Sequence, residues 1–206
     1  MSSYVAFVDP AGGSGGDSMT LAIAHAERRG ELLILVLDLV REARPPFSPE
    51  AVVADFAAVL KTYRINRVTG DRYAGDWPGE QFRKHGITYE PSPLTKSDLY
   101  RELLPLLNSG RAELLDHPRL LAQLGSLERR TGRGGRDTID HPPGPQAHDD
   151  LANCCAGAIV LAVSAAVIAW TPEHFATLSS MNAVLARSSP WAPEDGGERH
   201  SFLQRR

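Results

Sequence analysis

The order of the first five predicted elements limits most strongly what this chain can fold into. Three extended apolar runs come first, joined by short connections, and a helix and a brief fourth strand follow them. The three runs, the helix and the last strand cover residues 4–9, 19–27, 31–40, 48–64 and 67–71. Neighbouring runs with short glycine-containing connections pair as antiparallel hairpins. A strand that follows a helical crossover lies parallel to an earlier strand, so this order predicts an α/β fold with a mixed sheet, first antiparallel and then parallel, flanked by helices.

Local signals indicate where several elements begin and end. Ser48 is a good N-cap and Pro49 fits the first turn of the first helix. Thr95 can cap a later helix, which we expect Pro105 to kink or shorten. The remaining helices are expected over residues 78–84, 118–129 and about 147–170, and the remaining strands over residues 87–90 and 112–115. Residues 129–136 are basic and glycine-rich and are predicted to form a loop.

Chain length and composition indicate one domain with a hydrophobic core. The chain has 206 residues, of which 42% are hydrophobic, enough for one α/β domain and too few for two large ones. We expect this domain in residues 1–170, and a further helix with a polar tail of unknown role in residues 171–206. The uncharged run at residues 154–170 would span roughly 25 Å as a helix, less than the roughly 30 Å core of a bilayer. This run is therefore predicted to be a buried helix, with no membrane contact.

Cysteine usage and charge narrow the setting of the protein. Cys154 and Cys155 are the only cysteines, and their adjacency suits neither a disulfide framework nor a zinc site. The first residues lack the features of a signal peptide, so we expect a cytoplasmic protein. The net charge of −3 argues against a protein that coats nucleic acid through bulk positive charge, so any contact with nucleic acid must be local.

Four aspartates stand where strands end and the last long helix begins. If the first helix is a right-handed crossover, the strands ending at Asp9 and Asp71 are neighbours ~4.8 Å apart, and the two carboxylates lie side by side. Such a pair needs a counter-cation, and Mg2+ or Mn2+ suits an oxygen-only site. Asp149 and Asp150 can supply the third ligand group. Each acid alone has a simpler explanation, as a turn residue or as a partner of the helix dipole, and only their joint order favours a metal site.

The motifs around these acids resemble the nuclease domain of the large terminase subunit of tailed bacteriophages. The resemblance covers roughly residues 4–162 and rests on residues 7–11 with the glycine loop and Asp17, and on residues 68–75, 140–144 and 148–153. The last segment, His-Asp-Asp-Leu-Ala-Asn, is the most specific. The resemblance implies a ribonuclease-H-like fold in which Asp9, Asp71 and Asp150 are the catalytic metal ligands and Asp149 is an accessory or alternative ligand.

The resemblance also implies an activity and partners. The implied activity is that of a metal-dependent endonuclease that cuts double-stranded DNA during viral genome packaging, by two-metal hydrolysis with Mg2+ or Mn2+. The implied partners are double-stranded DNA, an ATPase motor domain, the portal and the small terminase subunit, in the cytoplasm of the host cell. The sequence contains no G-x-x-x-x-G-K-[ST] motif, so we expect either an excised nuclease domain or a free-standing relative without the packaging ATPase.

Basic side chains are candidates for gripping DNA phosphates near the cut. We assign this role to Arg130, Arg133, Arg136 and Lys96, with a merely solvated loop as the alternative for the arginines. The glycine stretch at residues 12–16 could cradle a phosphate, but it lacks a lysine and is flanked by strands, which favours a hairpin turn. His148 is as consistent with a polar residue at a helix start as with a participant in the chemistry.

Two other functions of the chain, from different classes of protein, remain possible on the sequence. An actin-like or sugar-kinase-like ATPase also begins with a strand-end aspartate followed by glycines, but it would need a second glycine-rich phosphate loop, which residues 70–72 do not supply. A catalytically silent interaction module of the same fold is the other reading, and intact acids argue against it only weakly. A metal-binding measurement would discriminate between the silent module and the nuclease.

Overall fold

The computed structural model describes residues 3–71, 75–131, 137–144 and 148–168. A six-stranded sheet forms the centre of the molecule, in the order β5-β4-β1-β2-β3-β6. Its strands are β1 (Tyr4–Asp9), β2 (Met19–Arg29), β3 (Leu32–Ala43), β4 (Arg67–Gly70), β5 (Thr88–Pro91) and β6 (Ala112–Glu113). The helices are α1 (Pro49–Thr62), α2 (Trp77–Lys84), α3 (Lys96–Asn108), α4 (Pro118–Ser126) and α5 (Asp150–Ile168). A separate two-stranded sheet contains β7 (Glu128–Thr131) and β8 (Asp137–Asp140).

The strand pairing follows the predicted order. β1 and β2, and then β2 and β3, pair antiparallel, whereas β4 lies parallel to β1 and β5 parallel to β4. The mixed sheet, antiparallel first and then parallel, is therefore confirmed. β6 adds a short parallel edge beside β3.

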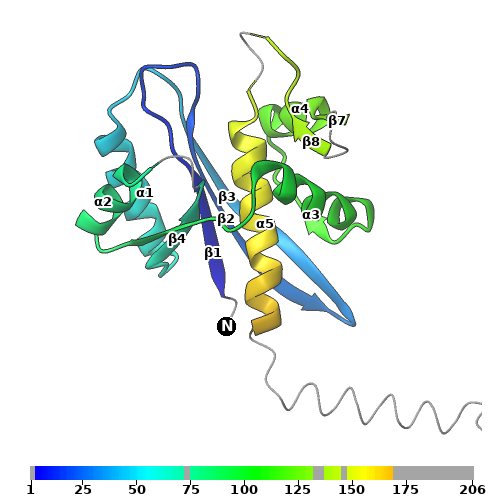
Figure 1. The fold of residues 1–206 in the computed structure, drawn as a ribbon. Helices are drawn as coiled ribbons and strands as arrows, with labels where there is room; N and C mark the ends of the chain where they lie inside the picture. Colours follow the sequence, from blue (N-terminus) through cyan, green and yellow to red (C-terminus); the bar gives the residue numbers. More distant parts are fainter. Residues whose placement is uncertain (1–2, 72–74, 132–136, 145–147, 169–206) are drawn as a thin grey trace, which may run out of the picture. The chain divides into compact units, whose positions relative to one another are not determined.

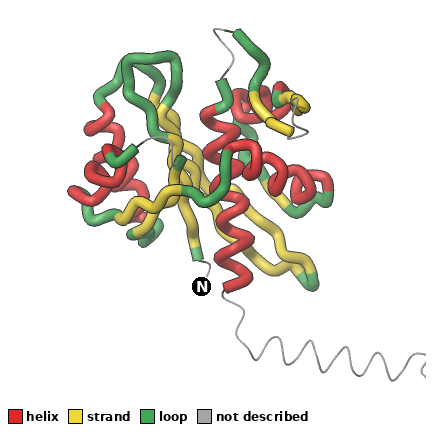
Figure 2. Tube along the Cα trace, viewed as in Figure 1, coloured by secondary structure: helices red, strands yellow, loops and turns green. Residues whose placement is uncertain are grey.

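Helices cover both faces of the sheet (Figures 1 and 2). Side chains alternate between the faces along β1, so that Phe7 points to one core and Ala6 and Val8 point to the other. The core beneath α1 and α2 contains Phe56 and Phe82, and the opposite core is formed with α3, α4 and α5. The sheet is thus buried on both sides, as expected for strands this rich in Val, Ile and Leu.

Capping interactions fix the helix starts that the sequence predicted. The Ser48 side chain accepts a hydrogen bond from the backbone N–H of Ala51, 3.3 Å away, and Pro49 occupies the first turn of α1. Thr95 and Asp98 form a reciprocal capping box at the start of α3. Pro105 does not shorten α3, which continues to Asn108, because the buried Leu103 and Leu106 on either side of it pack into the core.

α5 packs unusually close to the sheet because it carries a glycine at the contact point. A Cβ at Gly157 would overlap the ring of Phe7, a fully buried residue of β1. Three residues earlier, the thiol of Cys154 donates to the backbone carbonyl of Phe7 at 3.0 Å. α5 is therefore a buried core helix, as predicted, and no helix among the described residues is long and apolar enough to span a membrane.

Two sequence predictions about the second half of the chain need correction. Residues 129–131 belong to β7, where a loop was expected, and β8 pairs with it. α4 ends at Ser126, before the predicted end at residue 129, because the chain turns to extended backbone at Leu127 and enters β7. The tail at residues 171–206 lies outside the described residues, and the described chain up to Val167 forms one compact unit.

Candidate metal centre

The two strand-end aspartates lie next to each other, as the crossover predicted. β1 and β4 pair in the register Phe7 to Thr69 and Val8 to Gly70, which brings Asp9 and Asp71 level at the strand ends. The backbone N–H of Asp71 donates to the carbonyl of Val8 at 3.3 Å, and the Tyr89 hydroxyl donates to the carbonyl of Asp71 at 2.7 Å. These contacts hold the backbone of Asp71 against the end of β1.

The start of α5 brings Asp149 and Asp150 to the same strand ends. Both side chains belong to residues with little exposure, 5% and 8%. One turn further along α5, the amide of Asn153 donates to Oδ2 of Asp9 at 2.8 Å. Because Asn153 and Asp150 lie on neighbouring turns of one helix, the hydrogen bond to Asp9 holds the acidic helix start over the end of β1.

The pKa of Asp9 reflects its burial among other carboxylates. The pKa of Asp9 is raised from 3.8 to about 7, first because the carboxyl is buried and then because of the negative charges of Asp150, Asp71 and Asp149. The hydrogen bond from Asn153 opposes this shift. No Lys or Arg of the described chain forms an ion pair with Asp9 or Asp150. Three carboxylates near a buried fourth one favour the binding of a cation.

Asp149 differs from Asp9 and Asp150 because a lysine side chain is bonded to it. The Lys96 ammonium lies 3.1 Å from Oδ2 of Asp149 and 2.7 Å from Oδ1 of Asp140, and the Tyr100 hydroxyl donates to Oδ2 of Asp149 at 2.8 Å. Burial lowers the pKa of Lys96, but its bonds to Asp140 and Asp149 outweigh burial and raise it overall. Asp149 is thus held in the wall of the site by α3.

Asp150 remains available on the other side of the helix start. Its Oδ2 accepts a hydrogen bond from the backbone N–H of Ser18 at 2.8 Å, and its pKa is raised, chiefly by burial and against that hydrogen bond. Of the charges that act on Asp9, that of Asp150 contributes more than that of Asp149. Of the two helix acids, Asp149 is paired with Lys96, whereas Asp150 forms no ion pair with a Lys or Arg of the described chain.

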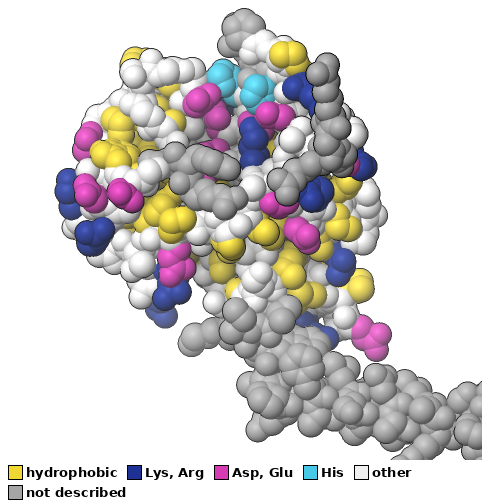
Figure 3. All heavy atoms as spheres, viewed as in Figure 1, with side chains coloured by type: hydrophobic (Ala, Val, Ile, Leu, Met, Phe, Trp, Pro, Cys, Tyr) yellow, Lys and Arg dark blue, Asp and Glu magenta, His cyan; other side chains and the backbone are white. Residues whose placement is uncertain are grey.

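Among the described residues, two groups of side chains bring their ligand atoms close together, and sequence reasoning did not predict either group. One contains Asp150 and the other Asp149, and Asp9 and Asp71 belong to neither. In one, a ligand atom from each of Asp17, His148 and Asp150 lies within 4.8 Å of the others, with His148 Nδ1 3.2 Å from Oδ1 of Asp17. In the other, Asp140, His141 and Asp149 meet in the same way. Figure 3 shows histidines beside acidic and basic side chains on this face.

Close backbone packing supports the first group. A Cβ at Gly16 would come within 3.0 Å of the His148 ring, so the glycine loop passes directly against this histidine. The loop that follows β1 therefore carries Asp17 to the start of α5. Only the path of the loop reveals this meeting, because Asp17 and His148 lie 131 residues apart.

The structure places two of the four predicted DNA-binding residues, Lys96 and Arg130. Lys96 lies at the site but is paired with Asp140 and Asp149. Arg130 bonds to Glu128 and to the carbonyl of His141 on the exposed two-stranded sheet. Arg133 and Arg136 lie outside the described residues. A role of these four side chains in DNA binding remains a prediction.

Solved structures of large terminases share this fold. The large terminase nuclease from the thermophilic phage G20c superposes with a TM-score of 0.61 at 19% identity, over 79% of this chain and 82% of that one. The same phage nuclease with bound magnesium superposes with a TM-score of 0.59 at 18% identity, over 76% of this chain and 80% of that one. The HK97 bacteriophage large terminase superposes with a TM-score of 0.60 at 15% identity, over 78% of this chain and 40% of that one.

The chain therefore has the fold of large terminase nuclease domains, and the predicted α/β fold with a mixed sheet flanked by helices is confirmed. No protein-family model matches the sequence, and no curated protein does. The donor set fits a hard divalent ion, because Asp9, Asp71 and Asp150 offer carboxylate oxygens. Asn153 adds a buried amide oxygen that has no hydrogen-bond partner within the described chain, and which a bound ion or water could satisfy.

Proposed function

We propose that this chain is a divalent-metal-dependent endonuclease that cuts double-stranded DNA, as in viral genome packaging. The observation that carries the proposal is the meeting of Asp9, Asp71 and Asp150 at the ends of β1 and β4 and the start of α5, in the fold of terminase nuclease domains. These three carboxylates are buried or half-buried, and Asp9 and Asp150 form no ion pair with a Lys or Arg of the described chain. Keeping such charged groups folded together costs free energy unless a cation binds among them. The terminase nuclease of phage G20c with bound magnesium supports the choice of metal.

The proposed roles follow from the contacts of each side chain. Asp9, Asp71 and Asp150 would hold two Mg2+ or Mn2+ ions, which would supply an activated water and stabilise the leaving 3′ oxygen. Asn153 orients the Asp9 carboxylate through its 2.8 Å hydrogen bond. Asp149 is the accessory acid, and the Lys96 ammonium bonded to it offsets one negative charge of the cluster. This lowers the repulsion that an incoming phosphate must overcome.

Partners and setting follow as parts of the same proposal. Double-stranded DNA is the substrate, and an ATPase motor domain, a portal and a small terminase subunit are the proposed partners, in the cytoplasm of a host cell. Residues 1–170 form the proposed nuclease domain. Cutting is expected to be independent of sequence, because the proposed contacts of Arg130, Arg133 and Arg136 are to phosphates, which carry no base information.

Plasmid cutting tests the proposal. The purified chain should convert supercoiled plasmid to nicked and linear forms in Mg2+ or Mn2+ and should be silent in excess EDTA. The Asp150→Asn and Asp71→Asn variants should lose cutting, whereas Asp55→Asn, a matched change on the exposed face of α1, should retain it. Cutting that persists in EDTA or in both site variants contradicts the proposal, as does ATP hydrolysis without cutting, the result expected of the actin-like alternative.

A further inference from the structure

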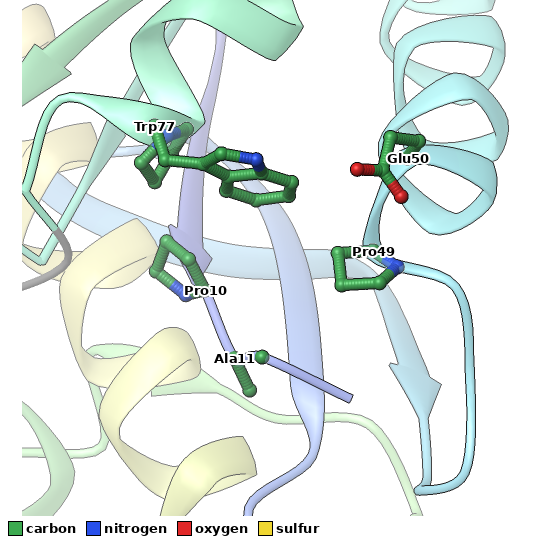
Figure 4. Close-up of a pocket in the computed structure, with 7 residues that line it drawn as sticks. Pro10, Ala11, Pro49, Glu50 and Trp77 are labelled. Atoms are coloured by element: carbon green, nitrogen blue, oxygen red, sulfur yellow. The ribbon is translucent and has the colours of Figure 1, made fainter. Parts of the chain in front are cut away.

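A pocket of about 400 Å3 opens directly beside the proposed metal centre. Pro10, Ala11 and Gly12 from the loop after β1 form one wall, Pro49 and Glu50 at the start of α1 form a second, and Trp77 at the start of α2 forms a third. Figure 4 shows the indole of Trp77 extending over Pro10 toward Pro49 and Glu50. The volume of this pocket lies in the range of pockets that bind small molecules, ~300–1,000 Å3.

The chemistry of the walls selects the kind of group that fits. Trp77 is half-buried and offers an aromatic face, and the three prolines that line the pocket, Pro10, Pro49 and Pro78, are rigid and apolar. Glu50 is the one charged residue among those that line the pocket, so the pocket disfavours a phosphate. The carboxylate of Glu50 can accept hydrogen bonds but cannot donate them. A flat, neutral, aromatic group with N–H donors at its edge satisfies all of these walls.

The position of the pocket connects it to the chemistry of the metal centre. Pro10 directly follows Asp9, and Trp77 begins the first helix after Asp71. A group in the pocket would therefore lie next to the residue that follows Asp9. In DNA, the flat aromatic groups attached next to a phosphate are the nucleobases.

We propose that this pocket binds one unpaired nucleobase of the DNA strand whose phosphate lies at Asp9 and Asp71. The base stacks on Trp77, and its amino or imino N–H groups donate to the carboxylate of Glu50. The inference rests on the proposed nuclease function and deepens it, because it gives the site a preferred substrate class. That class is duplex DNA with an unpaired or easily opened base beside the cut, since opening a paired base costs a few kcal/mol.

The test uses the intact chain and a DNA duplex that contains a single unpaired 2-aminopurine, a fluorescent base. Binding is measured in EDTA, where the proposed nuclease cannot cut, by anisotropy of an end label, and stacking is measured by the 2-aminopurine emission. The wild-type protein should quench this emission. Trp77→Ala should abolish the quenching and raise the Kd about five- to 150-fold, the effect of losing one base–aromatic stack. Trp77→Phe should keep most of the affinity.

A second variant guards against misfolding of the first. Gly12→Leu should fill the pocket without strain, because a Cβ at Gly12 meets no atom within 4 Å. It should abolish quenching while the thermal melt stays unchanged. Tyr4→Ala removes an exposed aromatic ring at the opposite end of β1 and should alter neither emission nor Kd. A fully paired duplex should bind the wild type and Trp77→Ala equally.

The outcomes separate this inference from the proposed function. If the protein cuts plasmid in Mg2+ but Trp77→Ala and Gly12→Leu bind the bulged duplex as the wild type does, the pocket inference is overturned and the nuclease proposal stands. The inference is also overturned if the wild type does not bind the bulged duplex or does not quench its emission. Failure of metal-dependent cutting with normal quenching would overturn the nuclease proposal alone.

Discussion

Replacing Gly157 by alanine should destabilise the protein, whereas the same change at Gly125 should stabilise it. Both glycines lie inside helices, α5 and α4, where alanine is favoured by about 1 kcal/mol. A Cβ at Gly125 meets no atom within 4 Å, so this variant should gain about 1 kcal/mol in the free energy of unfolding. A Cβ at Gly157 overlaps the ring of Phe7, which is fully buried and cannot move aside.

The magnitude at Gly157 follows from two opposing effects. Overpacking a tight core costs about 3 kcal/mol at the upper end of its usual range, and the helix preference returns about 1 kcal/mol, which leaves a net loss of about 2 kcal/mol. The two variants should therefore differ by about 3 kcal/mol. Urea denaturation measures both, and adding Phe7→Leu should reduce the loss at Gly157 because it opens space for the methyl group. Equal stabilisation at both positions would refute the close packing of α5 on β1.

Three further predictions concern the acids. In thermal melts, Mn2+ should raise the Tm of the wild type much more than that of Asp71→Asn, because an ion that binds only the folded state stabilises it; equal shifts would show that Asp71 is not a ligand. Without metal, the free energy of unfolding should fall as the pH rises from 3.8 to about 7, because folded Asp9 keeps a proton that the unfolded chain has lost, and Asp9→Asn should flatten this slope in pH-dependent urea titrations. If Asp9→Asn leaves the pH dependence of the free energy of unfolding unchanged, that dependence belongs to other titratable groups. Lys96→Met should lower the free energy of unfolding by roughly 1–3 kcal/mol, because Asp149 loses its cation. Adding Asp149→Asn should restore part of this loss in the same denaturation assay. If Lys96→Met causes no loss, the ion pair is solvated and does not stabilise the fold.

Much of the fold was predictable because its signals are local. The hairpins, the Ser48 cap and the helical crossover each follow from residues that are close in sequence. The pairing of β7 with β8 was not predictable, because β7 is exposed and charged, β8 is short, and neither strand has a clear apolar alternation. Their position depends on α3, where the Ser97 hydroxyl bonds to the backbone of Ile139.

The candidate site was predictable in part for the same reason. The meeting of Asp9 and Asp71 follows from strand order alone. Asp149 and Asp150 were expected to supply the third ligand group from their place at a helix start, and the terminase resemblance implied Asp150 as the ligand and Asp149 as the accessory. The contacts of Lys96 and Ser18, which lie far away in the sequence, could not be predicted. The roles of Asn153, Asp17 and Tyr100 escaped the sequence, because each acts through a neighbour more than 40 residues away in the chain.

The central claim is that Asp9, Asp71 and Asp150 together hold the metal ions that cut DNA. Anomalous scattering from crystals of this chain soaked in Mn2+ tests it most directly. The account predicts two Mn2+ peaks ~3.5–4 Å apart, each with oxygen ligands from these three aspartates and with Asp149 still paired to Lys96. Peaks confined to Asp17 and His148, or to Asp140 and His141, or no peak within ligand distance of Asp9, would contradict it.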